Sequence, residues 1–276
     1  MQPMIKSVIG LLQQRALAAQ PTVVAKLGFV AASLIFFLMA STAAIATQTV
    51  KVGASAFSPY IEAVEGSKAR IELIDLMNAF QDKYHFELVL TGPMRRFVDF
   101  DRGLYDVSCF DNLAWGWGER EVEATQVYLS GGEVYVALAK PGRDQSFFAD
   151  LTDKRMIGMR GYHYGFAKFN ADPDFLERNF GMTLTYNNEN TLRFLFLNRG
   201  DVAVVTEAFL PSYFMRNPQH KNKVLISQKR DQDYMHTCIV RRGTHPNASE
   251  LDQLLKAMEQ KGVLKPFWKK YGVEGK

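Results

Sequence analysis

Two successive runs of alternating strand and helix patterns constrain the fold of this chain more than any other feature. In the first run, residues 50–53, 86–90 and 106–110 have the apolar character of strands. Between them, apolar side chains recur every three or four positions in residues 73–84 and 97–104, as on one face of a helix. Strands separated by helices of this length predict a parallel sheet with helices on its faces and right-handed connections.

A second run follows a strand at residues 133–138. Its elements are a strand at 156–159, a helix at 166–180, a strand at 183–186, a helix at 192–197, a strand at 201–205, a helix at 209–215 and a strand at 224–226. A strand at 234–240 and two helices close the chain, and the first of these helices has Asn247 and Glu250 at the positions of a capping box.

The second run is complete before the C-terminal tail begins, so we expect the tail to pack against the elements of the first run. The sequence therefore predicts an α/β protein of two lobes, each a mostly parallel sheet flanked by helices. Lobe 1 would comprise residues 47–138 and 233–276, and lobe 2 residues 139–232. The chain would cross twice, near residues 138–142 and 227–232, and such crossings permit hinge closure over a ligand.

The first 46 residues have the pattern of a targeting segment. Residues 27–46 carry no charge, follow Lys26 and end in Ala44-Ile45-Ala46, which fits the small-x-small cleavage rule. We therefore expect a signal peptide at residues 1–46, cleaved after Ala46, and a periplasmic or secreted protein. The alternative is an uncleaved membrane anchor, because twenty apolar residues in a helix just span a hydrocarbon core.

Without that leader the chain is almost neutral. The 276 residues contain 33 Lys and Arg and 29 Asp and Glu, and three of the basic residues lie in the leader. The remaining 30 basic and 29 acidic residues leave a net charge of +1. Nucleic-acid binding requires clustered Lys and Arg, so we expect no nucleic-acid partner.

The two cysteines, Cys109 and Cys238, each lie in a strand-like run. In an exported protein such a pair forms a disulfide if the two strands are neighbours, and otherwise the cysteines are small buried residues. Five scattered His residues, none in the i, i+4 spacing of a zinc helix, leave His236 and Cys238 as the nearest pair of potential ligands. We expect no metal and no cofactor.

Short motifs occur in a consistent order along the mature chain. They lie at residues 50–53, 57–60, 103–106, 118–120, 130, 150–151, 157–158, 199–203 and 262–271. In this order the chain resembles the type 2 periplasmic solute-binding proteins, family 3, which includes the amino-acid-binding components of ABC-type uptake transporters. The resemblance covers about 220 residues. It implies a periplasmic-binding-protein-like fold whose two lobes close on a small molecule.

The resemblance also implies a role for Arg120, which matches the arginine of the family's Thr-x-x-Arg segment. An arginine there would pair with a ligand carboxylate, because the planar guanidinium fits two carboxylate oxygens. In this chain Trp117 replaces the threonine. The alternative for Arg120 is a surface ion pair with one of the glutamates at positions 119, 121 and 123.

The segment at residues 111–118 is the most unusual in the chain, with Asp111, Asn112, Trp115 and Trp117 following a strand end. In α/β folds ligands bind outside the carboxyl ends of the strands, so we expect these side chains, and at least one of the two indoles, at the mouth of the cleft. The family pattern places Phe57 and Tyr60 similarly, after the first strand. Core packing is the alternative for one Trp and for Phe57.

In lobe 2, residues 160–165 join a strand to a predicted helix, so we expect their backbone N–H groups to bind an anionic ligand group, with help from Arg160 and Tyr162. Amino-acid binders usually have an aspartate for the ligand ammonium after the next strand, whereas this chain has Thr206 and Glu207. Because side chains alternate along a strand, Glu207 would face away and Thr206 would meet the ligand as a neutral group.

These features predict a binding protein that performs no chemistry. It would capture a small polar, carboxylate-bearing solute and present it to a membrane permease, and we expect it to be a monomer. Two alternatives remain open, a sensory module for a membrane receptor and a small lyase on the same fold. A lyase would need an acid or base that only Asp111, His163 or Glu207 could supply.

Overall fold

The computed structural model describes residues 47–64 and 68–270. The predicted signal peptide, its cleavage point and the end of the motif at residues 262–271 lie outside the described residues. Within the described residues, no helix has the length and apolar character needed to cross a membrane.

The main sheet combines two sets of parallel strands. Its strands are β1 (Gln48–Ala54), β4 (Tyr84–Leu90), β5 (Val107–Asp111), β6 (Val122–Ala124), β7 (Leu129–Leu138), β8 (Met156–Met159), β9 (Thr183–Thr185), β10 (Val202–Thr206) and β11 (Val224–Arg241). In the described part of the chain these nine strands have the order β4-β1-β5-β11-β7-β10-β8-β9, with β6 also paired to β11. A separate hairpin joins β2 (Glu62–Val64) to β3 (Lys68–Arg70).

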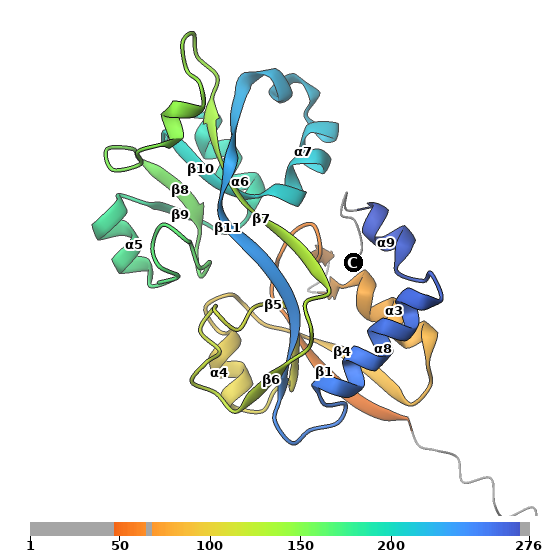
Figure 1. The fold of residues 1–276 in the computed structure, drawn as a ribbon. Helices are drawn as coiled ribbons and strands as arrows, with labels where there is room; N and C mark the ends of the chain where they lie inside the picture. Colours follow the sequence, from red (N-terminus) through yellow and green to blue (C-terminus); the bar gives the residue numbers. More distant parts are fainter. Residues whose placement is uncertain (1–46, 65–67, 271–276) are drawn as a thin grey trace, which may run out of the picture. The chain divides into compact units, whose positions relative to one another are not determined.

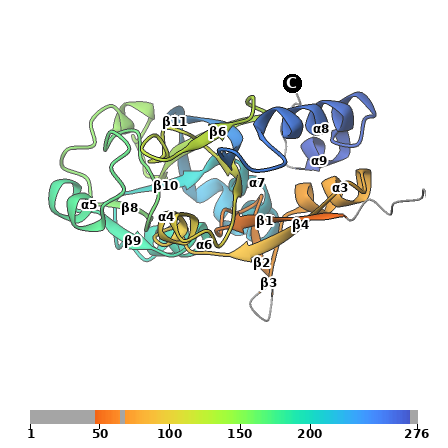
Figure 2. The same cartoon turned by 90° about the horizontal axis from the view of Figure 1, so that it is seen from below.

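Helices cover both faces of each parallel set, as the alternating pattern predicts. They are α3 (Glu72–Phe80), α4 (Arg96–Asp101), α5 (Pro173–Phe180), α6 (Asn188–Phe196), α7 (Leu210–Arg216), α8 (Ala248–Gln260) and α9 (Lys265–Lys270), with 3-10 turns at Gln145–Phe148, Glu207–Phe209 and Pro218–Lys223. Lobe 1 is the set β4-β1-β5, with α3, α8 and α9 on one face and α4 on the other (Figure 1). α8 and α9 lie together, as Figure 2 also shows.

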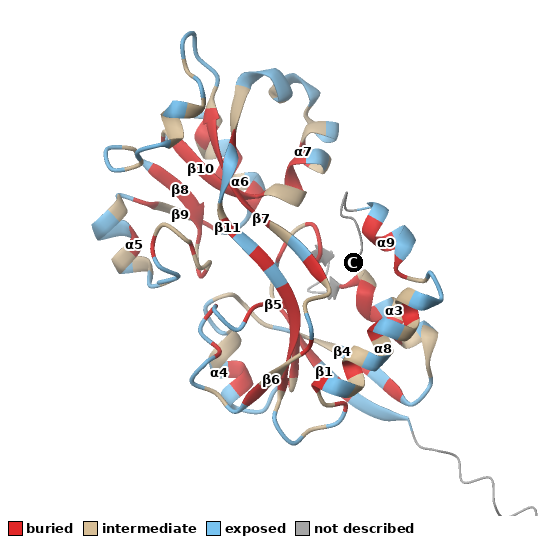
Figure 3. Cartoon of the chain, in the orientation of Figure 1, coloured by how far each residue is buried: buried red, intermediate tan, exposed pale blue. Residues whose placement is uncertain are grey.

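Lobe 2 is the set β10-β8-β9, in which β8 pairs in parallel with both neighbours. Its two apolar cores lie on opposite faces of the sheet, one beneath α6 and α7 and the other beneath α5. The buried residues therefore follow the strands, while the outer faces of the helices are exposed (Figure 3). The C-terminal tail returns to lobe 1, because Leu251, Leu255 and Met258 of α8 pack in the core of that lobe.

Two long antiparallel strands, β7 and β11, connect the lobes and run side by side through the middle of the sheet (Figure 1). The sequence predicts two strands at residues 224–226 and 234–240, whereas the structure has the single 18-residue strand β11. The sequence does not indicate that the strand is continuous, because residues Ser227 to Asp233 are mostly polar. The strand is partly exposed in this part, and its register shifts twice. The lobe limits at residues 138 and 232 stay predictions.

The predicted helix at residues 166–180 is too long. Only Pro173–Phe180 is helical, with Asp172 as its N-cap. Lys168 and Phe169 have positive φ angles of 53° and 61°, which an α-helix cannot contain. By contrast, the capping box of Asn247 and Glu250 is confirmed at the start of α8.

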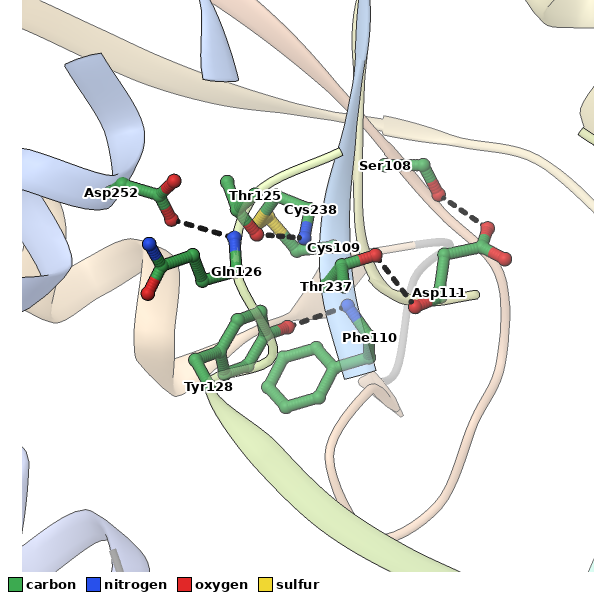
Figure 4. Close-up of a disulfide and its surroundings, with 10 residues drawn as sticks. All are labelled: Ser108, Cys109, Phe110, Asp111, Thr125, Gln126, Tyr128, Thr237, Cys238 and Asp252. Carbon is green, nitrogen blue, oxygen red and sulfur yellow. Dashed lines mark hydrogen bonds between the residues drawn. A yellow bond between two sulfur atoms is a disulfide. The ribbon is translucent and has the colours of Figure 1, made fainter. Parts of the chain in front are cut away.

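Cys109 and Cys238 form a disulfide between the neighbouring strands β5 and β11 (Figure 4). The register of these strands shifts beside the disulfide, and Phe110 has a φ of 57° while its N–H donates to the Tyr128 hydroxyl. A bulge of this kind redirects the side chains that follow it. Here the next side chain is Asp111, which ends β5 at the edge that carries the candidate site.

Candidate functional site

A cavity of about 40 Å³ lies between the two lobes, at the carboxyl ends of β1, β4, β5 and β8. This is the edge where α/β sheets bind ligands. Side chains from both lobes and from the connecting strands β7 and β11 line it. A cavity of this size holds a few water-sized groups, so a larger solute requires the surrounding side chains or the lobes to move.

Four of the predicted site residues line this cavity, namely Phe57, Asp111, Trp115 and Tyr162. Phe57 lies at the centre of an aromatic cluster, with ring centroids 6.3 Å from Trp115 and 5.8 Å from Tyr162. Asp111 accepts hydrogen bonds from the Ser108 hydroxyl and from the N–H of the following residue. These residues form an apolar wall with one carboxylate at its edge.

Arg120 and Trp117 do not line the cavity. The Arg120 guanidinium donates twice to Asp101, at 2.8 and 3.0 Å, and lies over the Phe97 ring. This is a surface ion pair, although its partner is none of the glutamates that the sequence suggests. Trp117 is fully buried, and its indole makes edge contacts with Phe97 and Phe100 in the core beside α4.

The other predicted residues also lie outside the cavity lining. Tyr60 stacks on Phe110 in the core, and the Asn112 side chain accepts from the Ala114 N–H within a turn. Arg160 follows β8 but does not reach the lining, and Thr206 is buried at the end of β10. Glu207 also lies outside the lining, and its carboxylate pairs with Arg230 at 2.6 Å on the surface.

Two backbone amides at the end of the loop after β8 are already paired with an anion of the chain itself. The N–H groups of Gly165 and Phe166 donate to the Asp231 carboxylate, at 2.6 and 2.9 Å. Asp231 also accepts from the Tyr135 hydroxyl at 2.6 Å. The chain therefore provides its own anion for these two amides, because Asp231 belongs to β11, which passes beside the loop. The helix α5 starts only later, at Pro173.

Arg96, at the start of α4, brings a positive charge to the cavity. Its side chain is 11% exposed, and its Nη2 donates to the Trp115 carbonyl at 2.7 Å. Asp111 lies 3.8 Å from Nη1, while the buried Nε has no hydrogen-bond partner among the residues that the structure describes. A guanidinium that is mostly shielded from solvent at a cavity is suited to binding a carboxylate.

Glu133, on β7, brings a second carboxyl group to the cavity and is 1% exposed. It accepts a hydrogen bond from the Gln232 amide at 2.8 Å, and the Gln232 oxygen in turn accepts from the Trp115 indole at 3.0 Å. Burial, together with the charge of Asp231, raises the pKa of Glu133 to about 8. The carboxyl group is therefore mostly protonated at neutral pH.

His163 links the two lobes across the cavity. Its Nδ1 lies 3.3 Å from Arg96 Nη2, and its carbonyl accepts from the Gln232 amide. Burial and the Arg96 charge lower the pKa of the imidazole to about 3, so the ring is neutral. Beside it, a Cβ on Gly161 would lie 2.7 Å from Pro93 Cβ, which shows how closely the loops of the two lobes approach.

Sequence reasoning missed Arg96, Glu133 and Gln232. Glu133 carries a signal, since a charged residue at the start of an otherwise apolar strand is unusual. Arg96 carries none, because it lies in a polar stretch beside Arg95. Among the described residues, no three His, Cys, Asp or Glu side chains gather as metal ligands.

This chain matches known proteins in its structure but not in its sequence. No family model and no curated protein matches the sequence. Among solved structures, Tv2483 bound to L-arginine has a TM-score of 0.63 at 15% identity over 81% of this chain and 90% of that one. A substrate-binding protein of an ABC uptake transporter from Streptococcus pneumoniae, with bound histidine, has a TM-score of 0.62 at 16% identity over 81% and 92%.

A histidine kinase sensor domain similar to periplasmic binding proteins has a TM-score of 0.62 at 18% identity over 82% of this chain and 96% of that one. The fold thus occurs in both transport and sensory proteins. The chain has the two-lobed α/β fold of the type 2 periplasmic binding proteins, the fold of amino-acid-binding components of ABC transporters.

Proposed function

We propose that this chain is an extracytoplasmic solute-binding protein that captures a small carboxylate-bearing solute by closure of its lobes and presents it to a membrane permease. The observation that carries the proposal is Arg96, whose guanidinium is 11% exposed at a cavity lined by both lobes and whose Nε has no partner within the described part of the chain. In this proposal Arg96 has the role that the family resemblance assigns to Arg120.

The aromatic wall formed by Phe57, Trp115 and Tyr162 would contact the rest of the solute. His163 and Gln232 would join the lobes around it, because they already connect lobe 2 to Arg96 and to Trp115. No step of this process makes or breaks a covalent bond. The solute should therefore leave the protein unchanged.

A thermal-shift screen of the purified chain tests the proposal. The panel contains the amino acids, small mono- and dicarboxylates, and amines without a carboxylate. A compound present at 100 times its dissociation constant adds about 2.7 kcal/mol to the free energy of unfolding. We expect stabilisation by a carboxylate compound, loss of that effect in Arg96→Ala and weakening in Arg96→Lys, which keeps the charge but loses the planar fork.

Arg120→Ala is the comparison variant. If the effect disappears in Arg120→Ala and persists in Arg96→Ala, the carboxylate contact lies where the family resemblance places it. If no carboxylate compound stabilises the chain, the proposed function is wrong. Localisation is tested separately by N-terminal sequencing of the exported protein, which should begin at Thr47.

A lyase is the second candidate, and Glu133 is the observation that favours it. A buried carboxyl group with a raised pKa beside a cavity is the kind of group that moves protons in enzymes. Mass spectrometry of the stabilising compound after long incubation separates the two candidates. A consumed compound would establish the lyase, and unchanged recovery supports the binding protein.

A further inference from the structure

We propose that His163 of lobe 2 holds the two lobes together by accepting a hydrogen bond from Arg96 of lobe 1, and that the carboxylate of the solute displaces His163 from this guanidinium. The chain thus carries an internal competitor for its own binding site. The hydrogen bond needs no solute, since both partners belong to the chain. The displacement rests on the proposed function, in which Arg96 binds the carboxylate.

The chemistry of the two groups fixes the direction of this hydrogen bond. A guanidinium has donors but no acceptor, so Arg96 Nη2 donates and His163 Nδ1, 3.3 Å away, accepts. An accepting Nδ1 requires a neutral ring that carries its proton on Nε2. His163 therefore presents a lone pair to Arg96, as an oxygen of a carboxylate would.

The number of hydrogens on Arg96 Nη2 makes the two acceptors exclusive. A carboxylate that uses both of its oxygens binds an edge of the guanidinium, and each of the two edges that carry a parallel pair of N–H groups includes Nη2. One hydrogen of Nη2 is donated to the Trp115 carbonyl at 2.7 Å and the other to His163 at 3.3 Å. The carboxylate must replace one of these acceptors, and the longer bond, to His163, is the weaker.

Two glycines allow the lobes to approach closely beside this hydrogen bond. A Cβ on Gly116 of lobe 1 would lie 3.6 Å from His163 Nε2, and a Cβ on Gly161 of lobe 2 would lie 2.7 Å from Pro93 Cβ. Both glycines have positive φ angles, of 88° and 80°. Each lobe thus presents a glycine to a side chain of the other lobe at the place where His163 reaches Arg96.

The loop that carries His163 is fixed to the connecting strand β11. The His163 carbonyl accepts from the Gln232 amide, and the N–H groups of Gly165 and Phe166 donate to Asp231. This loop and α4 lie on the same side of β7 and β11 (Figure 1). The hydrogen bond from Arg96 therefore restrains lobe 2 as a whole, and the carbonyl of His163 keeps its contact with Gln232 when the imidazole gives up Arg96.

A solute binds only those molecules in which the guanidinium is free of His163. The apparent affinity is then reduced by the fraction of such molecules, and a substitution that frees Arg96 removes this reduction. Loss of His163 as an acceptor should therefore open the lobes and strengthen binding, whereas loss of an ordinary ligand contact would weaken binding.

Distances between two spin labels test the hydrogen bond with no solute added. The labels are attached at Arg102→Cys on lobe 1 and Glu177→Cys on lobe 2, two exposed positions, while the native cysteines stay in their disulfide. His163→Asn supplies an oxygen in place of Nδ1, and His163→Leu has the same branching without an acceptor. We expect the ratio of open to closed molecules to rise about tenfold in His163→Leu and to change little in His163→Asn.

His220→Leu is the matched control. His220 Nδ1 lies 2.7 Å from the Tyr213 hydroxyl, and both residues belong to lobe 2, so this substitution removes a histidine hydrogen bond that does not join the lobes. The label distances should equal those of the unaltered protein. Arg96→Ala removes the other partner and should open the lobes as His163→Leu does, and combining the two substitutions should open them no further.

Isothermal titration with acetate, succinate, L-glutamate and L-arginine tests the displacement. We expect at least one of these carboxylates to bind the unaltered protein. Its Kd should be about tenfold lower in His163→Leu and nearly unchanged in His163→Asn, because only the first variant frees Arg96.

The two measurements fail separately. Equal label distances in the unaltered protein and in His163→Leu, or the same change in His220→Leu or His163→Asn, overturn the hydrogen bond as the contact that joins the lobes. A Kd in His163→Leu that equals or exceeds that of the unaltered protein overturns the displacement. If none of the four carboxylates binds, the proposed function fails and the displacement fails with it, while the label distances still decide whether His163 joins the lobes.

Discussion

The pH dependence of folding stability should reveal the protonated state of Glu133 without any ligand. The pKa of this carboxyl group rises from an ordinary value of 4.5 to about 8 in the folded protein. Between these values the folded state holds a proton that the unfolded state has lost. The free energy of unfolding therefore decreases as the pH rises through this interval, by about 1.4 kcal/mol per pH unit.

Two histidines oppose this slope at lower pH. Burial lowers the pKa values of His163 and His236 to about 3, so both are neutral in the folded protein. The unfolded chain protonates them below about pH 6.5, and their contribution to stability is lost as the pH falls. Because these histidines titrate in the same way when Glu133 is replaced, the difference between the unaltered protein and a Glu133 variant isolates the contribution of Glu133.

From pH 6.5 to pH 8 the contribution of Glu133 to the free energy of unfolding should decrease by about 2 kcal/mol. Glu133→Gln keeps the side-chain size and an oxygen that accepts from Gln232, and it should remove this loss. Urea denaturation followed by fluorescence of the three tryptophans measures both proteins at each pH. Parallel profiles for the two proteins from pH 6.5 to pH 8 would refute the reasoning.

Three other predictions concern stability and closure. Replacing Cys109 and Cys238 by serine should cost about 5 kcal/mol in urea denaturation, because the disulfide closes a loop of 129 residues in the unfolded chain, and a cost below about 1 kcal/mol would contradict this. Gly161→Ala should lower stability and weaken ligand binding in titrations, since its Cβ would meet Pro93, whereas Gly142→Ala has a similar positive φ without that contact and should affect stability alone. Asn247→Ala should lower stability by about 1 kcal/mol through loss of the capping box, and an unchanged denaturation midpoint would exclude that role.

Residues near the site show why only part of it could be predicted from the sequence. Trp115 and Asp111 follow a strand end, and their place at the cavity follows from the general position of ligand sites in α/β folds. Arg120 matches a family motif, but the residues around it differ and its guanidinium pairs with Asp101 instead. A motif match places a residue in the chain, whereas its partner depends on which segment packs beside it.

The strand and helix periods of this sequence are sufficient to predict the two-lobed α/β fold, because each apolar face must be buried against a neighbouring element. The disulfide, the single strand β11 and the pairing of Glu133 with Thr206 and Gln232 across the sheet are decided only by tertiary structure. They depend on the register of strands that are distant in sequence, and local patterns carry no information on that register. The charge balance of the site belongs to this second group, since burial beside Asp231 keeps Glu133 protonated.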